Sequence, residues 1–151
     1  MPGERVARTF APNARIDEWA RFTGHLLNGR PSGAWQTGQS FAVTKWDGGL
    51  AAAVVTTEIA PGVAHVAQVV VDPAYRRRGV ARQLLLMAAA AAKAQGAKRL
   101  TLMVGEDNDR ARILFESLGF TQRCTFVHGA RGPVTRILSG VAIRATGRVA
   151  A

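Results

Sequence analysis

The sequence has a single cysteine, Cys124, and its three histidines lie far apart along the 151 residues. One cysteine cannot form a disulfide within the chain, and neither residue type has the spacing of a metal site. Long apolar runs are also missing, because the longest uncharged apolar stretch, 83–92, has about half the length of a membrane span. The N-terminus lacks the apolar segment of a signal peptide. We therefore expect a cytoplasmic protein without a metal and without a membrane partner.

Acidic residues are scarce, since ten of them stand against twenty basic residues and leave a net charge of +10. A charge of this size is compatible with nucleic-acid binding. However, the basic residues are spread along the chain, and no aromatic residues are interleaved with them as a single-strand-binding surface requires. The one basic cluster, at residues 76–78, suits an anionic small ligand better. We expect no nucleic-acid partner.

The order of the predicted elements indicates one domain over residues 1–151, with no repeat or linker. Ala and Leu dominate a predicted helix from 80 to about 95, which Gly96 ends. A second helix, capped by Asn108 or Asp109, carries an apolar stripe and ends at Gly119. The remaining predicted elements are strands over 5–10, 40–46, 50–59, 63–71, 99–104, 120–128 and 133–138, and a helix from Asn13. This order predicts an α/β (α+β) fold with helices packed on a mixed sheet.

The segment 69–82 carries the clearest chemical signal, because a strand there runs through a short loop into the first turn of a helix. The first amides of a helix have no carbonyl partner and sit at the positive end of its dipole, so such a turn binds anions. Gly79 and Ala81 leave the backbone open to a ligand. Three arginines at 76–78 are unfavourable next to a helix N-terminus unless an anion lies among them. The alternative is that they simply point into solvent.

Arg76, Gly79 and Ala81 match the Arg/Gln-x-x-Gly-x-Gly/Ala loop that binds pyrophosphate in the GNAT superfamily of acetyl-CoA-dependent N-acetyltransferases. The second signature of that family, Asn-x-x-Ala-x-x-Leu-Tyr-x-x-x-Gly-Phe, is resembled at Asn108, Ala111, Leu114, Gly119 and Phe120. The resemblance covers roughly residues 40–138. It implies a GNAT-like mixed, mostly antiparallel twisted sheet of about six to seven strands flanked by helices.

The resemblance also implies acetyl-CoA (coenzyme A) as the cofactor, with its pyrophosphate on the backbone amides of 77–82. Strand residues 69–71 would offer main-chain groups to the pantetheine arm, as in the addition of a strand to a sheet. The residues expected to bind the cofactor are Val69, Val70, Val71, Arg76, Arg77, Arg78, Gly79, Val80, Ala81, Arg82, Asn108 and Phe115.

A base is needed because an ammonium group must lose a proton before it can attack. His65 lies eleven residues before Arg76, where similar protein-acetylating members carry a glutamate base. An imidazole titrates near neutral pH, which suits the role. A structural role for His65 stays open, and Glu58 acting through water is the alternative base.

Phe115 departs from the family pattern, which often has a tyrosine there, proposed to protonate the departing CoA thiolate. A phenyl ring has no proton to give, so core or cofactor packing is the role expected of Phe115. Ser117 or Cys124 could act as the acid, CoA could leave as a thiolate stabilised by positive charge, or catalysis could be lost.

The implied function is transfer of an acetyl group from acetyl-CoA to a primary amine, on a small molecule or a protein, by direct attack in a ternary complex. Phe115 supports an alternative, a catalytically weak acyl-CoA-binding or regulatory module. A nucleic-acid-binding protein is supported by charge alone. Homodimers are common in the family that the chain resembles, and residues 140–151 could form an interface strand or a flexible tail.

Overall fold

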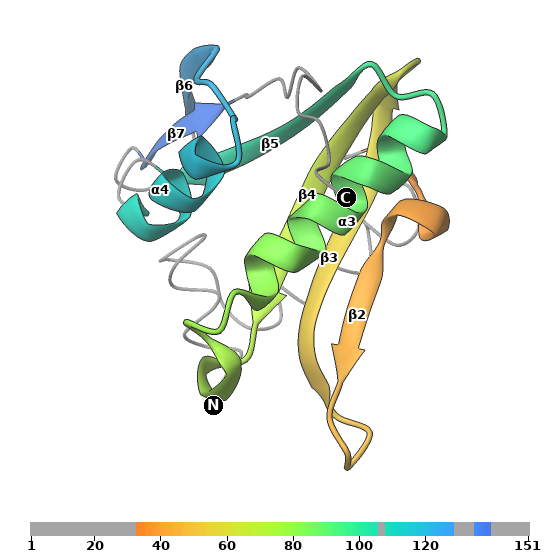
Figure 1. Ribbon diagram of the computed structural model, residues 1–151. Helices are drawn as coiled ribbons and strands as arrows, with labels where there is room; N and C mark the ends of the chain where they lie inside the picture. The colour runs from red at the N-terminus through yellow and green to blue at the C-terminus, as the bar shows by residue number, and fades with distance from the viewer. Residues whose placement is uncertain (1–32, 106–107, 129–134, 140–151) are drawn as a thin grey trace.

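The computed structural model describes residues 33–105, 108–128 and 135–139. In this part of the chain seven strands form one sheet, and helices α3 and α4 pack on it (Figure 1). The elements, with η for a 3-10 helix, are β1 (Ala34–Trp35), η1 (Thr37–Gln39), β2 (Phe41–Thr44), β3 (Leu50–Ala60), β4 (Val63–Val71), η2 (Pro73–Tyr75), α3 (Val80–Ala94), β5 (Arg99–Gly105), α4 (Asp109–Ser117), β6 (Cys124–His128) and β7 (Thr135–Ser139). No helix within these ranges is long and apolar enough to cross a membrane.

The strands of the sheet are paired mostly in antiparallel fashion. Their order is β1-β3-β4-β5-β7-β6, and β2 pairs with β3 beside this path. The parallel pair is β4 with β5, and α3 makes the crossover between them. A mixed, mostly antiparallel sheet flanked by helices is the predicted fold class, which is thus confirmed.

Most of the predicted elements coincide with observed ones. The strand predicted over 63–71 is β4, and the helix expected after Gly79 begins at Val80. The strand predicted from Phe120 is wrong at its start, because Phe120 turns inward, where its ring lies 5.8 Å from that of Phe115; β6 begins only at Cys124. The two-residue strand β1 is too short to show a periodicity. The strand expected over 5–10 and the helix expected from Asn13 lie outside the described residues.

One apolar face of α3 holds the helix against the sheet. Its buried residues are Leu84, Leu85, Ala88 and Ala92, which share one side of the helix. They pack against alternate residues of three strands, namely Ala52, Val54, Ala64, Val66, Leu100 and Leu102. This layer fixes the N-terminus of α3 close to the end of β4.

We expect Leu85→Ala to lower the free energy of unfolding by about 2–5 kcal/mol, because the truncation leaves a cavity in this layer. Leu85 is 1% exposed, whereas its neighbour Leu86 is 46% exposed. Leu86→Ala is therefore the matched control, with an expected change within about 0.5 kcal/mol. Urea unfolding of the two variants measures both values. Equal losses in the two would contradict the packing described for α3.

Strand β4 changes partners halfway along its length. It pairs with β5 over residues 63–66, opposite 99–102, and no further. At that point Ala67 is an extra residue opposite β3, since Val55 pairs with Gln68 and Thr56 pairs with Val66. Such a bulge bends a strand and increases its twist. Beyond it β4 and β5 diverge, as Figure 1 shows, and β5 turns to pair with β7.

Candidate functional site

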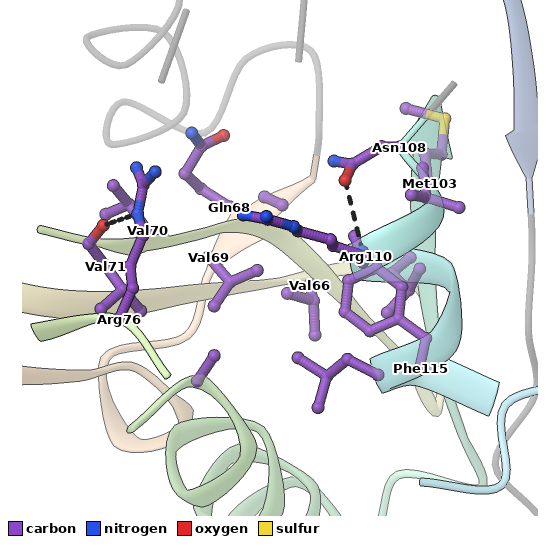
Figure 2. Close-up of a pocket in the computed structure, with 16 residues that line it drawn as sticks. Val66, Gln68, Val69, Val70, Val71, Arg76, Met103, Asn108, Arg110 and Phe115 are labelled. Atoms are coloured by element: carbon purple, nitrogen blue, oxygen red, sulfur yellow. Dashed lines mark hydrogen bonds between the residues drawn. The ribbon is translucent and has the colours of Figure 1, made fainter. Parts of the chain in front are cut away.

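The diverging strands β4 and β5 border a pocket of about 390 Å³. Its walls come from residues 66–71 of β4, residues 102–104 of β5 and the first turns of α4 (Figure 2). Pockets for small molecules usually measure roughly 300–1,000 Å³. Because no strand of the described residues pairs with β4 on this side after Val66, the main-chain groups of residues 67–71 that face the pocket can bind an extended ligand.

One end of the pocket leads to the turn that precedes α3. Gly79 is the N-cap of α3 and has a left-handed φ of 77°. The first bond within the helix runs from Gln83 N to Gly79 O, at 3.0 Å, so the amides of residues 80–82 have no helical partner. The first helical turn contains no acidic residue. A Cβ at Gly79 would meet no atom within 4 Å. The turn is therefore an open, positive site with the geometry for binding an anion.

The side chains of the arginines around this turn point in different directions. Arg76 Nε donates to Val71 O at 3.0 Å, which holds its guanidinium beside the end of β4 (Figure 2). The Arg78 guanidinium lies 5.7 Å from the ring centre of the tyrosine in η2. Arg82 reaches α4, where its Nη1 donates to Ser117 Oγ at 3.0 Å. An anion at the turn would thus be bound mainly by backbone amides, inside a ring of positive charge.

Arg77 adopts a left-handed φ of 65°, which is unfavourable for a residue with a side chain. A left-handed conformation costs about 1–2 kcal/mol per residue, and glycine avoids most of this strain. Glycine also makes the unfolded chain more flexible, which lowers the free energy of unfolding by about 0.5–1 kcal/mol. We therefore expect Arg77→Gly to raise the free energy of unfolding by about 0.5–1 kcal/mol. Urea unfolding tests this, and a loss of stability would show that the Arg77 side chain stabilises the turn.

Asp72 fixes the beginning of the loop. Its carboxylate accepts hydrogen bonds from Lys45 Nζ at 2.5 Å and from Ala74 N at 2.8 Å. The bond from Lys45, then the bond from Ala74, holds the pKa of Asp72 below its ordinary value. The carboxylate therefore stays ionised in mild acid and ties the β2–β3 hairpin to the loop.

A family model described as the acetyltransferase (GNAT) family matches residues 10–120, which contain β4, the loop, α3, β5 and α4. The chain belongs to the GNAT acetyltransferase family. It is therefore an acetyltransferase.

Solved structures share this fold. The ribosomal-protein-S18-alanine N-acetyltransferase from Escherichia coli has a TM-score of 0.64 and 22% identity, over 98% of this chain and 90% of that one. A spermidine N-acetyltransferase from Vibrio cholerae, in complex with CoA and spermine, has a TM-score of 0.66 and 20% identity, over 93% of this chain and 85% of that one. Ard1 from Thermoplasma volcanium has a TM-score of 0.68 and 18% identity, over 93% of this chain and 88% of that one. A search of curated proteins finds no match.

The second signature of the acetyltransferase lies at the far side of the pocket from Arg76 (Figure 2). Asn108 Oδ1 accepts a hydrogen bond from Ala111 N at 3.3 Å, which caps α4. The ring of Phe115 is buried and contributes to the pocket wall, in agreement with the packing role expected for it. Ser117 Oγ donates to Leu114 O at 2.7 Å and does not line the pocket. Cys124 begins β6, and its side chain lies outside the described part of the structure.

His65 lies on β4, one residue before the part of the strand that lines the pocket. Its Nδ1 is 2.9 Å from Thr101 Oγ1 on β5, and Thr101 Oγ1 itself donates to Ala64 O at 3.3 Å. A hydroxyl has one proton to donate, so His65 Nδ1 is the donor to Thr101 and the lone pair lies on Nε2. Burial lowers the pKa of His65 below 6.5, so the ring is neutral at pH 7.

Glu58 lies on the other face of the sheet from His65. It pairs with Ala64, a buried residue under α3, whereas His65 pairs with Thr57. The carboxylate of Glu58 accepts from Gly62 N at 3.2 Å and borders a second pocket near the C-terminus of α3. Val54 is the partner of Val69, a residue of the pocket wall. Glu58 stands four residues from Val54 along β3, a separation of roughly 13 Å.

The structure thus divides the predicted site residues into three groups. Those that line the pocket between β4 and β5 are Val69, Val70, Val71, Arg76, Ala81, Asn108 and Phe115. Those that form the anion-binding turn at its end are Arg77, Arg78, Gly79, Val80 and Arg82. His65 and Glu58 lie outside the pocket walls.

Three pocket residues with a polar, charged or sulfur-containing side chain were not predicted from the sequence: Gln68, Met103 and Arg110. Gln68 and Met103 belong to strands in which nothing local distinguishes them. Arg110 carried a usable signal, because it is a cation in the first turn of α4, where a positive charge is unfavourable.

Proposed function

We propose that this acetyltransferase transfers an acetyl group from acetyl-CoA to a primary amine, on a small molecule or a protein, by direct attack in a ternary complex. One observation carries the proposal: the pocket between β4 and β5 adjoins the turn before α3, since the pocket residues Arg76 and Ala81 stand on either side of Gly79 in the chain. Coenzyme A has the matching parts in the same order, an anionic pyrophosphate, an arm with two amides and a sulfur end.

The residues of the pocket would divide the binding among them. The free amides of residues 80–82 bind the pyrophosphate, and Gly79 gives it room. Main-chain groups of residues 69–71 bind the amides of the arm as a further strand would. Val66, Leu102 and Phe115 form apolar walls that exclude water from the sulfur end. When bound there, acetyl-CoA supplies an activated thioester, whose carbonyl oxygen a main-chain amide near 69–71 would polarise.

His65 would remove the proton from the acceptor amine. Its neutral ring and its Nε2 lone pair are the protonation state and the atom that a base needs. His65 and Val69 are at most about 13 Å apart along β4, so the proton would pass along a chain of water molecules, or the acceptor would extend from one to the other. Glu58 is the weaker base candidate, because it lies on the other face and borders the other pocket.

Calorimetric titration with acetyl-CoA, followed by a panel of amines, tests the proposal. The panel includes a peptide with an N-terminal alanine and spermidine, because two of the similar structures are named for such acceptors. We expect stoichiometric binding and release of free thiol with at least one amine. Binding without turnover on any amine would support the acyl-CoA-binding module instead, and absence of binding would remove the proposal.

A further inference from the structure

Among the described residues, the lining of the pocket between β4 and β5 offers no group that could protonate a departing thiolate. Its lining includes no tyrosine, cysteine, histidine, lysine, serine or threonine among the described residues. Phe115 occupies the place of the tyrosine, and Ser117 is turned away toward Leu114 O and Arg82. A leaving group with no proton donor nearby must depart as an anion, and its charge then has to be balanced by a fixed positive group.

Among the described residues two cations line the pocket, and their main chains stand on opposite sides of it (Figure 2). Arg76 is bound to Val71 O at the end next to the anion-binding turn. Arg110 starts from the first turn of α4, and Figure 2 shows its side chain extended across the pocket toward β4, where Gln68 is labelled. This is the end at which β4 and β5 begin to diverge, and so the end that the sulfur of coenzyme A would reach.

Among the described residues, Arg110 has no partner that would compete with a ligand. Within the described part of the chain it forms no hydrogen bond or ion pair, whereas its neighbour Arg112 pairs with Asp109 at 3.4 Å. A guanidinium is always protonated and keeps its five donors available. An uncommitted cation beside apolar walls interacts more strongly with an anion than it would in water.

We infer that Arg110 is the group that receives the thiolate of coenzyme A, in place of a proton donor. The inference rests on the proposed function. The amine nitrogen forms the new bond to the acetyl carbon while the carbon–sulfur bond breaks. The electron pair of that bond stays on sulfur, paired with the Arg110 guanidinium, and the proton of the amine goes to His65. The thiolate takes its proton from water after release.

The decisive experiment compares the binding of coenzyme A with that of desulfo-coenzyme A, which lacks the sulfur, between pH 6 and pH 9. A nearby arginine lowers the pKa of a thiol. The affinity ratio of the two ligands should therefore rise with pH in the unmodified protein, about tenfold for each unit by which the bound thiol's pKa is lowered. In Arg110→Gln the ratio should be independent of pH up to the pKa of the free thiol, and Arg110→Lys should restore part of the rise. Arg112→Gln is the matched control from the same helix and should behave like the unmodified protein.

Turnover gives a second readout. Arg110→Gln should lower kcat about 10²-fold with little change in KM for acetyl-CoA, since the charge on sulfur is absent before reaction. A pH-dependent ratio that persists in Arg110→Gln would overturn the inference. So would tighter binding of succinyl-CoA than of acetyl-CoA that disappears in this variant, because Arg110 would then recognise an acyl carboxylate. If neither coenzyme A nor its desulfo analogue binds, the proposed function itself fails, which distinguishes the two.

Discussion

Gly79→Glu should abolish the binding of acetyl-CoA while the protein remains folded. A Cβ at Gly79 would meet no atom of the described residues within 4 Å, so the substitution costs backbone strain at a φ of 77° but no steric clash at Cβ. It places a carboxylate where we propose that the pyrophosphate binds. Like charges in contact cost several kcal/mol, which corresponds to an affinity loss of about 100-fold or more. Calorimetry with acetyl-CoA measures the loss, and circular dichroism checks the fold.

Gly96→Glu provides the matched control. Gly96 is also left-handed, with a φ of 90°, and a Cβ there also meets nothing within 4 Å. The substitution therefore introduces the same kind of backbone strain and the same charge. It does so at the other end of α3, roughly 22 Å away along a helix of 15 residues. Its affinity for acetyl-CoA should stay within about threefold of the original. Equal losses in both variants would mean that net charge, and not the turn, governs binding.

Gly79→Asn separates strain from charge at the same position. Asparagine tolerates the left-handed region better than most residues and is neutral. We expect it to retain most of the affinity that glutamate removes. If asparagine abolished binding as completely as glutamate does, any side chain at 79 would block the site and electrostatic repulsion would not be the cause.

The anion-binding turn could be predicted from the sequence because the signals that build it are local. Gly79 is needed for its positive φ, and the Ala- and Leu-rich stretch after it forms a helix on its own propensity. The strand before it is rich in valine, a residue that favours strands. Each of these signals spans fewer than about twenty residues, so no knowledge of distant contacts is required.

The pocket itself could not be predicted from the residues alone, because it depends on register. The bulge at Ala67 shifts the pairing of β4 with β3 at the place where β4 leaves β5. No residue type marks this bulge, and the divergence of the strands was implied only by the family resemblance. Register also decides between His65, the base candidate predicted from the sequence, and Glu58, its alternative. Glu58 on β3 pairs with Ala64, whereas His65 on β4 pairs with Thr57. Because successive residues of a strand point to opposite faces, Glu58 and His65 lie on opposite faces of the sheet.

His65→Gln should lower kcat by about 10²–10⁴-fold at pH 7, the usual contribution of a general base. Glutamine has a similar size and can still donate to Thr101 Oγ1, so the packing between β4 and β5 is kept. The pH dependence should change as well. Activity of the unmodified enzyme should fall as the pH drops through the lowered pKa of His65, because the protonated ring has no lone pair. In the variant the break at the pKa of His65 should vanish, and the rate should rise with pH only as the neutral fraction of the acceptor amine rises in solution.

Stability gives an independent check on the burial of the ring. Between 6.5, its ordinary pKa, and the lowered value, the unfolded chain binds more protons at His65 than the folded chain does. The free energy of unfolding should therefore decrease as the pH falls through this window, and His65→Gln should remove that decrease. The pH dependence of stability thus reports on the burial of His65, and kcat reports separately on its catalytic role.

Thr101→Val decides whether the orientation of the ring matters for the reaction. Valine has nearly the shape of threonine but cannot accept the proton of His65 Nδ1, so the donor is left unpaired and the Nδ1–H tautomer loses its advantage. We expect the ¹⁵N shifts of His65 to report a mixture of tautomers, kcat to fall about tenfold or more, and KM for acetyl-CoA to change little. Thr101→Ser keeps the hydroxyl and should restore both the tautomer and kcat. If the tautomer changes in Thr101→Val while kcat does not, His65 is a structural residue and the base must be sought elsewhere.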